Sequence, residues 1–175
     1  MGIKTLRVYL VCFFLLGVVY PFFLSLVAKV FFVSSFEGSW VKNQKGEVVG
    51  SRLVGQNFSQ DQYFWPRPSA NHYQGTAKAT QLGPLSPILK EQIEKRKAAG
   101  FKEEMLFASA SGYDPHISPS SAKMQVKRIS QVRKISEEEV FKVIDQNTEP
   151  AWLDLYGNFR VNVLTANLAL DALKK

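Results

Sequence analysis

The sequence is poor in the residues that make disulfides and metal centres. Its 175 residues include one cysteine and two histidines. Cys12 lies inside a long apolar stretch, so the rest of the chain has no thiol and no disulfide. His72 and His116 are far apart in the sequence, which leaves at most a metal site shared with carboxylates. We therefore expect no resident metal and a fold that depends on its hydrophobic core.

Motifs for nucleotide or ester hydrolysis are also missing. The chain has no Gly-x-x-x-x-Gly-Lys segment, which a P-loop needs to bind phosphates. It has no Gly-x-Ser-x-Gly segment, which presents the nucleophile of α/β-hydrolases. The net charge of +7 is not gathered in one basic tract, because basic and acidic residues alternate. The composition thus indicates neither a nucleic-acid partner nor an autonomous ATPase.

Charge is absent from residues 8–28, which read VYLVCFFLLGVVYPFFLSLVA. About 20 apolar residues in a helix cross a bilayer core, and a membrane helix tolerates a proline such as Pro21. No face of the stretch is polar, which disfavours a helix of a soluble core. The core of a cleaved signal peptide is shorter, at about 7–15 residues. We interpret residues 1–33 as an uncleaved single-span anchor and residues 34–175 as one domain.

The charges beside the span predict its orientation. Lys4 and Arg7 precede it, and Lys29 follows it. Cytoplasmic flanks of membrane helices carry an excess of Lys and Arg, so we expect a cytoplasmic N-terminus and an extracytoplasmic domain. Lys29 does not reverse this expectation, because a lysine can extend its ammonium group to the interface.

The domain after the anchor mixes strands and helices without regular βαβ alternation, which predicts the α+β class. Strands are expected within 40–50, around a turn at Gly46, and also at 105–108 and in pieces of 152–163. The expected helices run from Ser86-Pro87 to Gly100, from Ser118 to about Lys134, from a Ser136–Glu139 capping box onward, and from about 164 to 173.

Residues 59–85 show neither helical nor strand periodicity. They contain Tyr63, Phe64, Trp65 and Tyr73 among prolines and glycines. Long loops within compact domains are usually functional or disordered, and aromatic side chains argue against disorder because they supply apolar area to pack. We interpret this segment as an ordered surface loop that binds a partner.

The densest group of reactive side chains has two interpretations. Ser109 or Ser111 with His116 and Asp114 would supply the nucleophile, base and acid of an extracytoplasmic hydrolase. Alternatively, Asp114 bonds local backbone amides, His116 holds the turn, and Ser118 caps the next helix. The structural interpretation is favoured, because the members of catalytic triads are seldom adjacent in sequence.

Three segments, in order along the chain, carry a family resemblance. They are Leu53–Phe58 with Tyr63-Phe64 and Arg67–Ala70; Ser111–Pro119 with Gln125 and Arg128; and Arg160–Leu164 with Asn167 and Ala169–Asp171. Together with the N-terminal span, they resemble KdpC, the small single-span subunit of the bacterial Kdp potassium-transporting ATPase. The resemblance covers nearly the whole chain and places it in the bacterial inner membrane.

The resemblance implies a non-catalytic accessory subunit. Its partners would be a channel-like potassium subunit and a P-type ATPase subunit, which handle potassium and ATP, so the chain itself needs no tightly bound cofactor. The matching motif residues, expected to serve structure or an interface, are Gly55, Gln56, Arg67, Pro68, Gly112, Asp114, Pro115, His116, Ser118, Gln125, Arg128, Asn162 and Asn167.

The family is also described as a catalytic chaperone that raises the ATP affinity of the ATPase subunit, with a glutamine proposed to contact the nucleotide. By motif position that residue is Gln56. The predicted orientation places Gln56 outside the cytoplasm, where ATP is not found. A structural role, in which Gln56 bonds the backbone near its loop, is therefore favoured.

An accessory subunit needs its span to serve as an interface as well as an anchor. Gly17, Pro21, Ser25 and Ala28 fall on one face of the predicted helix. Small residues allow membrane helices to approach closely, so we expect this stripe to dock on the other subunits.

Overall fold

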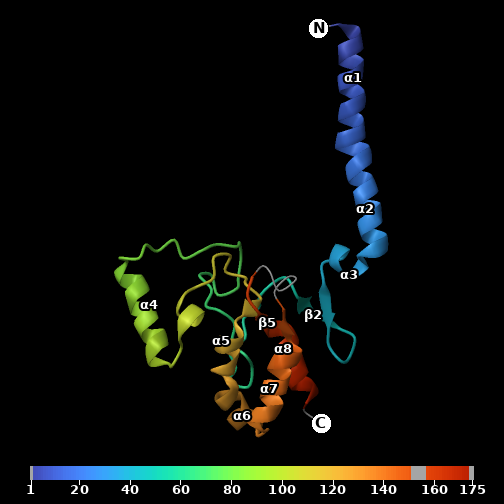
Figure 1. Ribbon diagram of the computed structural model, residues 1–175. Coiled ribbons are helices and arrows are strands. Elements are labelled where there is room, and N and C mark those ends of the chain that lie inside the picture. Colours follow the sequence, from blue (N-terminus) through green and yellow to red (C-terminus); the bar gives the residue numbers. More distant parts are fainter. Residues whose placement is uncertain (1, 151–156, 174–175) are drawn as a thin grey trace. The chain divides into compact units, whose positions relative to one another are not determined.

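The computed structural model describes residues 2–150 and 157–173. The chain forms two compact units, Met1–Trp40 and Val41–Lys175 (Figure 1). The first unit contains a long apolar helix, and the second contains both helices and strands. The predicted α+β class is confirmed.

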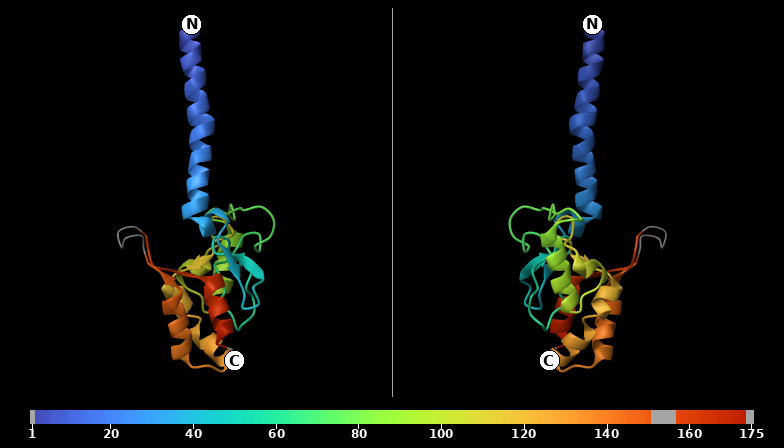
Figure 2. Two further views of the ribbon diagram at one scale, coloured as in Figure 1. Left: turned by 90° about the vertical axis from the view of Figure 1, so that its right-hand side faces the viewer. Right: turned by 90° about the vertical axis from the view of Figure 1, so that its left-hand side faces the viewer.

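The N-terminal helix is a continuous rod (Figure 2), and a π-helical segment within it makes the helix locally wider. It consists of α1 (Ile3–Phe14), a π-helical segment (Leu15–Val19) and α2 (Tyr20–Phe31). The rod Ile3–Phe31 is long and apolar enough to cross a membrane.

Pro21 accounts for the widening. Its ring has no amide hydrogen and would collide with the carbonyl of Gly17 in an ideal α-helix. The π-helical segment contains Gly17 and gives the chain room at this point. The hydroxyl of Ser25 donates a hydrogen bond of 2.9 Å to the Pro21 carbonyl. The widening therefore falls within the predicted docking stripe.

A short helix and a hairpin follow the rod. The helix α3 covers Val33–Phe36, and the hairpin pairs β1 (Trp40–Lys42) with β2 (Val48–Ser51). Gly46 has a φ of +82°, which confirms the predicted turn.

A small antiparallel sheet lies in the second unit. Its strands are β3 (His116–Ile117), β4 (Thr148–Glu149) and β5 (Arg160–Asn162), in the order β3-β5-β4. β5 confirms part of the strand predicted within 152–163, of which residues 151–156 lie outside the described residues. The sequence did not predict β3 and β4, because two residues are too short to show a strand period.

The helices of the second unit differ from prediction at two places. They are α4 (Pro87–Ala98), the 3₁₀ turn η2 (Glu103–Leu106), α5 (Pro119–Lys123), α6 (Val126–Arg133), α7 (Glu137–Gln146) and α8 (Val163–Ala172). The strand predicted at 105–108 is wrong, because η2 occupies the start of that range and buries Met105. The helix predicted from Ser118 to Lys134 is two helices, separated at Met124 and Gln125.

The predicted helix caps are mostly confirmed. The Ser136–Glu139 capping box makes both of its reciprocal bonds, and Ser118 accepts a hydrogen bond from the Ser121 amide. Gly100 has a φ of +87° and follows Ala99, the C-cap residue of α4, as a C′ glycine should. Ser86 precedes α4 as predicted, but its side chain makes no capping bond.

The hydrophobic core of the second unit lies among α5–α8 and the small sheet. Its largest buried apolar side chains are Phe64, Ile117, Ile129, Ile144, Leu170, Val126, Val140 and Val161. In Figure 1, α4 stands apart from this group, and it has no fully buried residue. Phe64 comes from the loop 59–85, so this loop contributes to the core although it has no helix or strand.

Candidate functional site

Four polar side chains hold the loop segment 61–65 in place. They are Gln125, Arg128, Arg133 and Asn167, and we call them the polar clamp. Asn167 accepts a bond of 2.8 Å from the Phe64 amide and donates one of 3.1 Å to the Phe64 carbonyl. Asn167 and Phe64 are both fully buried, so these bonds satisfy backbone groups that water cannot reach.

Gln125 forms the same pair of hydrogen bonds with the backbone of Trp65, the next residue of the loop. Its side-chain oxygen accepts a bond of 2.8 Å from the Trp65 amide, and its nitrogen donates one of 3.1 Å to the Trp65 carbonyl. Gln125 lies between α5 and α6, at the break that the sequence did not predict. The break thus places a carboxamide against the loop.

Arg128 extends the clamp toward the surface. Its guanidinium donates hydrogen bonds to the carbonyls of Asp61 and Tyr63 and to the side-chain oxygen of Gln125. It also lies over the Trp65 ring, at 3.8 Å from the ring centroid. Burial lowers the pKa of this guanidinium. All of these contacts are to the domain itself.

Sequence reasoning missed Arg133, the fourth member. Its side chain is only 1 % exposed, and it donates to the carbonyls of Gln62 and Leu170 and to Asp171. A signal was present, because Arg133 follows Val126 and Ile129 on one face of α6. A charged residue on an otherwise apolar face indicates a buried partner.

The turn around Asp114 brings the first two sequence motifs together. Asp114 accepts a bond of 3.0 Å from the His116 amide and forms an ion pair of 3.2 Å with Arg67. The Gly55 amide donates to the Tyr113 carbonyl at 2.8 Å. A Cβ atom at Gly55 would lie 2.5 Å from the Asp114 carbonyl oxygen, so no larger residue fits without movement.

Further motif residues secure the same turn. Gly112 has a φ of +74°, and a Cβ there would lie 2.9 Å from the Lys78 carbonyl oxygen. The Pro68 carbonyl accepts from the Ser109 amide, and the Pro115 carbonyl accepts from the Val163 amide at the start of α8, each at 2.9 Å. These bonds join the turn to the loop and to α8.

His116 lies beside the third motif, where it pairs with Asn162 across the small sheet. Its Nε2 is 3.4 Å from the amide nitrogen of Asn162, which donates to the Arg52 carbonyl and caps α8 through its oxygen. Burial lowers the pKa of His116, and Arg160 lowers it further. Both ring nitrogens also face carboxylates, because Nδ1 lies 3.9 Å from Asp114 and Nε2 lies 3.6 Å from Glu149.

The serines of the hydrolase interpretation have other surroundings. The Ser109 hydroxyl is buried without a hydrogen-bond partner, and the Ser111 hydroxyl accepts from the Tyr113 amide. A nucleophile needs a hydrogen bond to its base, and the His116 nitrogens face Asn162 and carboxylates instead. The geometry therefore favours the structural interpretation.

Gln56 contacts backbone rather than an open site. Its side-chain nitrogen donates a bond of 2.9 Å to the Val49 carbonyl in β2. A Cβ at Gly50 would lie 1.8 Å from that nitrogen, so the glycine makes room for the Gln56 carboxamide. Across residues 2–150 and 157–173, no group of three His, Cys, Asp or Glu side chains is placed to hold a metal ion.

These features define a class of protein. It has one apolar N-terminal helix and an α+β domain whose motif side chains hold its own backbone in a fixed arrangement. The family model described as "KdpC: K+-transporting ATPase, c chain" matches residues 3–172, and the chain belongs to this family.

Curated relatives agree over most of the chain. A protein of Polaromonas naphthalenivorans named potassium-transporting ATPase KdpC subunit is 42% identical, over 98% of this chain and 96% of the relative. Proteins with the same name from Myxococcus xanthus and Gloeobacter violaceus are 41% and 38% identical, over 97% and 91% of this chain and 86% and 89% of the relatives. The chain is thus a non-catalytic subunit of a potassium-transporting ATPase complex.

Proposed function

We propose that the chain is the accessory subunit through which a channel-like potassium subunit and a P-type ATPase subunit assemble into an active importer. The observation that carries this proposal is the polar clamp. The side chains of the polar clamp hydrogen-bond to the backbone of loop 61–65. The domain therefore presents a rigid surface instead of reactive groups. Rigid surfaces bind partners at a smaller entropic cost.

In this proposal the N-terminus is cytoplasmic in the inner membrane and the domain is extracytoplasmic. The support is the charge of the flanks, with Lys4 and Arg7 before the helix. Potassium and ATP are handled by the partner subunits. The bond between Gln56 and the Val49 carbonyl supports a structural role for this glutamine. Any effect on ATP affinity then passes through assembly with the ATPase subunit.

Co-purification tests the assembly. The full chain, tagged at its C-terminus, is expressed with the other two subunits and extracted in mild detergent. We expect both subunits on the affinity resin, and we expect potassium-stimulated ATPase activity to be lost when this chain is omitted. Recovery of the tagged chain alone, from cells that contain the other two subunits, would refute the proposal.

A labelling experiment tests the orientation. Cys12 is the single cysteine, so a Cys12→Ser chain provides a thiol-free background. A new cysteine at the exposed Gln131 should react with an impermeant maleimide in intact spheroplasts. A cysteine at Thr5, before the span, should react only after the membrane is permeabilised. The reverse pattern would place the domain in the cytoplasm.

A further inference from the structure

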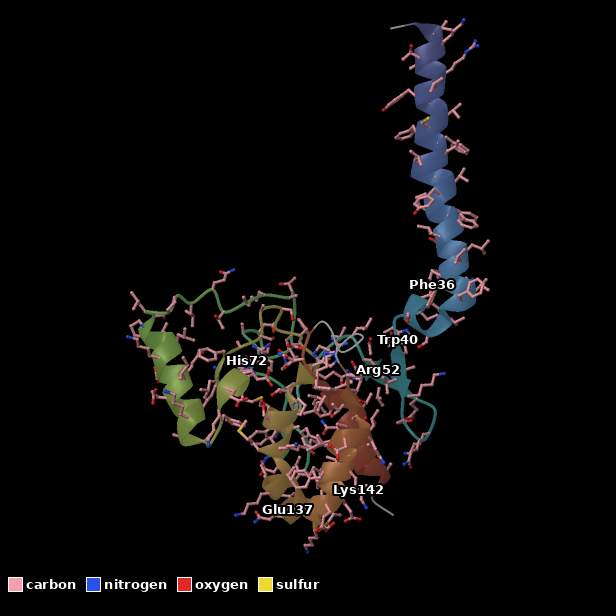
Figure 3. All side chains as sticks on the ribbon, viewed as in Figure 1. Phe36, Trp40, Arg52, His72, Glu137 and Lys142 are labelled. Carbon is pink, nitrogen blue, oxygen red and sulfur yellow. The ribbon has the colours of Figure 1, made fainter. Side chains whose placement is uncertain are left out.

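Two adjoining hollows lie between the loop and the α4–η2 region. The first, of about 350 Å³, has an aromatic wall, and the second, of about 250 Å³, is more polar. Both linings include Ser69, His72 and Arg96, so the hollows adjoin, and we call them together the loop groove. In the view of Figure 3, His72 lies between α4 and the side of the domain that carries α5.

Aromatic and apolar side chains form one half of the loop groove. They are Phe58, Trp65, Tyr73, Phe101 and Met105. The clamp sets the position of this wall, since Gln125 holds the Trp65 backbone and the Trp65 ring packs 5.7 Å from the Phe101 ring, centroid to centroid. A fixed aromatic surface of this kind suits an apolar side chain of a partner.

The lining of the groove contains three basic side chains and more positive than negative charge. Arg67, Lys78 and Arg96 line it, and no Asp or Glu of the described residues does. Arg67 pairs through one terminal nitrogen with Asp114, whereas its Nε is buried and has no hydrogen-bond partner. Buried donors are normally satisfied, so Arg67 keeps hydrogen-bonding capacity that the described residues do not use.

The positive charge of Arg96 has no carboxylate partner among the described residues. Its guanidinium donates to the Leu106 carbonyl at 2.6 Å, and burial lowers its pKa. Among residues 2–150 and 157–173, neither Arg96 nor Lys78 takes part in an ion pair. An anionic group in the groove would therefore meet the partly buried guanidinium groups of Arg67 and Arg96, where charge-assisted hydrogen bonds are stronger than in water.

The rim of the groove stores backbone strain. His72 and Tyr73 have φ values of +54° and +60°, two successive left-handed residues that are not glycine. The Tyr73 hydroxyl holds this conformation by donating to the Arg67 carbonyl at 2.6 Å, and burial raises the pKa of that hydroxyl. Such strain gathers where a ligand or partner binds.

We propose that the loop groove docks an extended acidic segment of another subunit of the complex, with a carboxylate at Arg67 and Arg96 and an apolar side chain against Trp65 and Phe101. This inference rests on the proposed function and names the surface that would contact the partner. An extended segment fits better than a small anion, because the groove joins a polar and an aromatic compartment that are both open to solvent. Only a chain fills both at once.

Photo-crosslinking within the assembled complex tests the occupant. A benzophenone amino acid is introduced at the exposed Ser59, which lines the aromatic half, at Lys78 in the polar half, and at Gln131 as a control outside the groove. We expect crosslinks from Ser59 and Lys78 to one segment of another subunit, containing Asp or Glu, at a yield at least fivefold above that from Gln131. If the subunits co-purify but no such crosslink forms, docking at the loop groove is refuted and the proposed function still stands.

The introduction of a charge at the groove provides a second test with matched variants. Ser59→Glu should lower the recovery of the partner subunits at least fivefold, whereas Ser59→Lys and Gln131→Glu should leave it unchanged. Thermal unfolding of each variant verifies that the exposed substitutions leave the fold intact. Equal recovery with Ser59→Glu and Ser59→Lys would contradict an acidic occupant.

A direct titration distinguishes a groove that binds a free anion from a groove that docks a segment of another subunit. The full chain in detergent is titrated with sodium citrate, and the Arg67→Met chain serves as the comparison. We expect no saturable binding below millimolar citrate in either chain. Tight binding that depends on Arg67, without a crosslink to another subunit, would make the groove a small-anion site and overturn the proposal.

Discussion

The carboxamide of Asn167 bonds both the amide and the carbonyl of Phe64, a residue 103 positions earlier in the chain. The two residues are fully buried, and each polar group of the Phe64 backbone finds its partner on one side chain. An irregular loop can therefore cross the core without leaving unsatisfied backbone groups. The same principle governs Gln125 and Trp65 one residue further on.

Removal of the two hydrogen bonds between Asn167 and Phe64 should destabilise the fold. Asn167→Ala leaves a buried donor and a buried acceptor unpaired, each at a cost of about 1–3 kcal/mol. We expect the free energy of unfolding of the full chain in detergent to fall by about 2–5 kcal/mol, measured by chemical denaturation. Gln131→Ala is the control, and as an exposed substitution it should change stability by less than about 0.5 kcal/mol. Equal stability of the two variants would contradict the role of the clamp.

Gly55 should not tolerate a methyl group. A Cβ at this position would lie 2.5 Å from the Asp114 carbonyl oxygen and 2.9 Å from the Tyr73 ring. Overpacking of this kind costs about 1–3 kcal/mol, so Gly55→Ala should lower the thermal midpoint by several degrees. Gly83→Ala is the matched control, because a Cβ there meets nothing within 4 Å. A midpoint unchanged in Gly55→Ala would show that the Asp114 turn can move aside.

His116 should make stability depend on pH. Burial and Arg160 lower its pKa, although Glu149 and Asp114 act in the opposite direction and Arg52 adds to the lowering. In the unfolded chain an imidazole takes up its proton near about pH 6.5. The contribution of neutral His116 to stability is therefore complete above that pH and is lost as the pH falls through the lower folded-state pKa.

Thermal unfolding at pH 7.5, 6.5 and 5.5 measures this effect. The midpoint should fall with pH, and His116→Gln should reduce the fall because glutamine does not titrate there. His72→Gln, at the exposed second histidine, should behave as the unaltered chain does. The same reduction from both substitutions would assign the effect to general charge instead of to His116.

The docking stripe of the span should be sensitive to bulk. Leucine at Gly17 or Ser25 would keep another helix away, and we expect at least a fivefold loss of partner subunits on co-purification. Phe22→Leu, off the stripe, should leave recovery unchanged. If all three substitutions weaken recovery equally, the helix acts as a plain anchor without a preferred docking face.

Local signals allowed much of the fold to be predicted. The hairpin turn at Gly46, the cap at Ser118 and the capping box at Ser136 each depend on a few neighbouring residues, and all three are confirmed. The strand predicted at 105–108 is wrong because its local signal was ambiguous. Apolar residues in a short run do not distinguish a buried strand from the buried side chain of a single 3₁₀ turn, which is what Met105 provides.

The candidate site was only partly visible in the sequence. The motif positions of Gln125, Arg128 and Asn167 were identified, but their bonds to the loop were not, because the bonds join residues 60 to 103 positions apart. A partner-binding loop was predicted at 59–85, but the groove that it forms with distant residues was not. It forms where the loop meets α4 and η2, and no pattern along the chain indicates which distant side chains will share a surface.

The sequence by itself determined the apolar helix, the α+β class and the local turns, since length, hydropathy and nearby side chains decide these features. Only the tertiary structure decided how the clamp holds residues 61–65, why Gly55 has no room for a side chain, and why Arg67 keeps a buried nitrogen without a partner. The physical reason is that buried hydrogen-bonding groups must find partners wherever the folded chain brings them, which depends on the whole fold and not on neighbours in sequence.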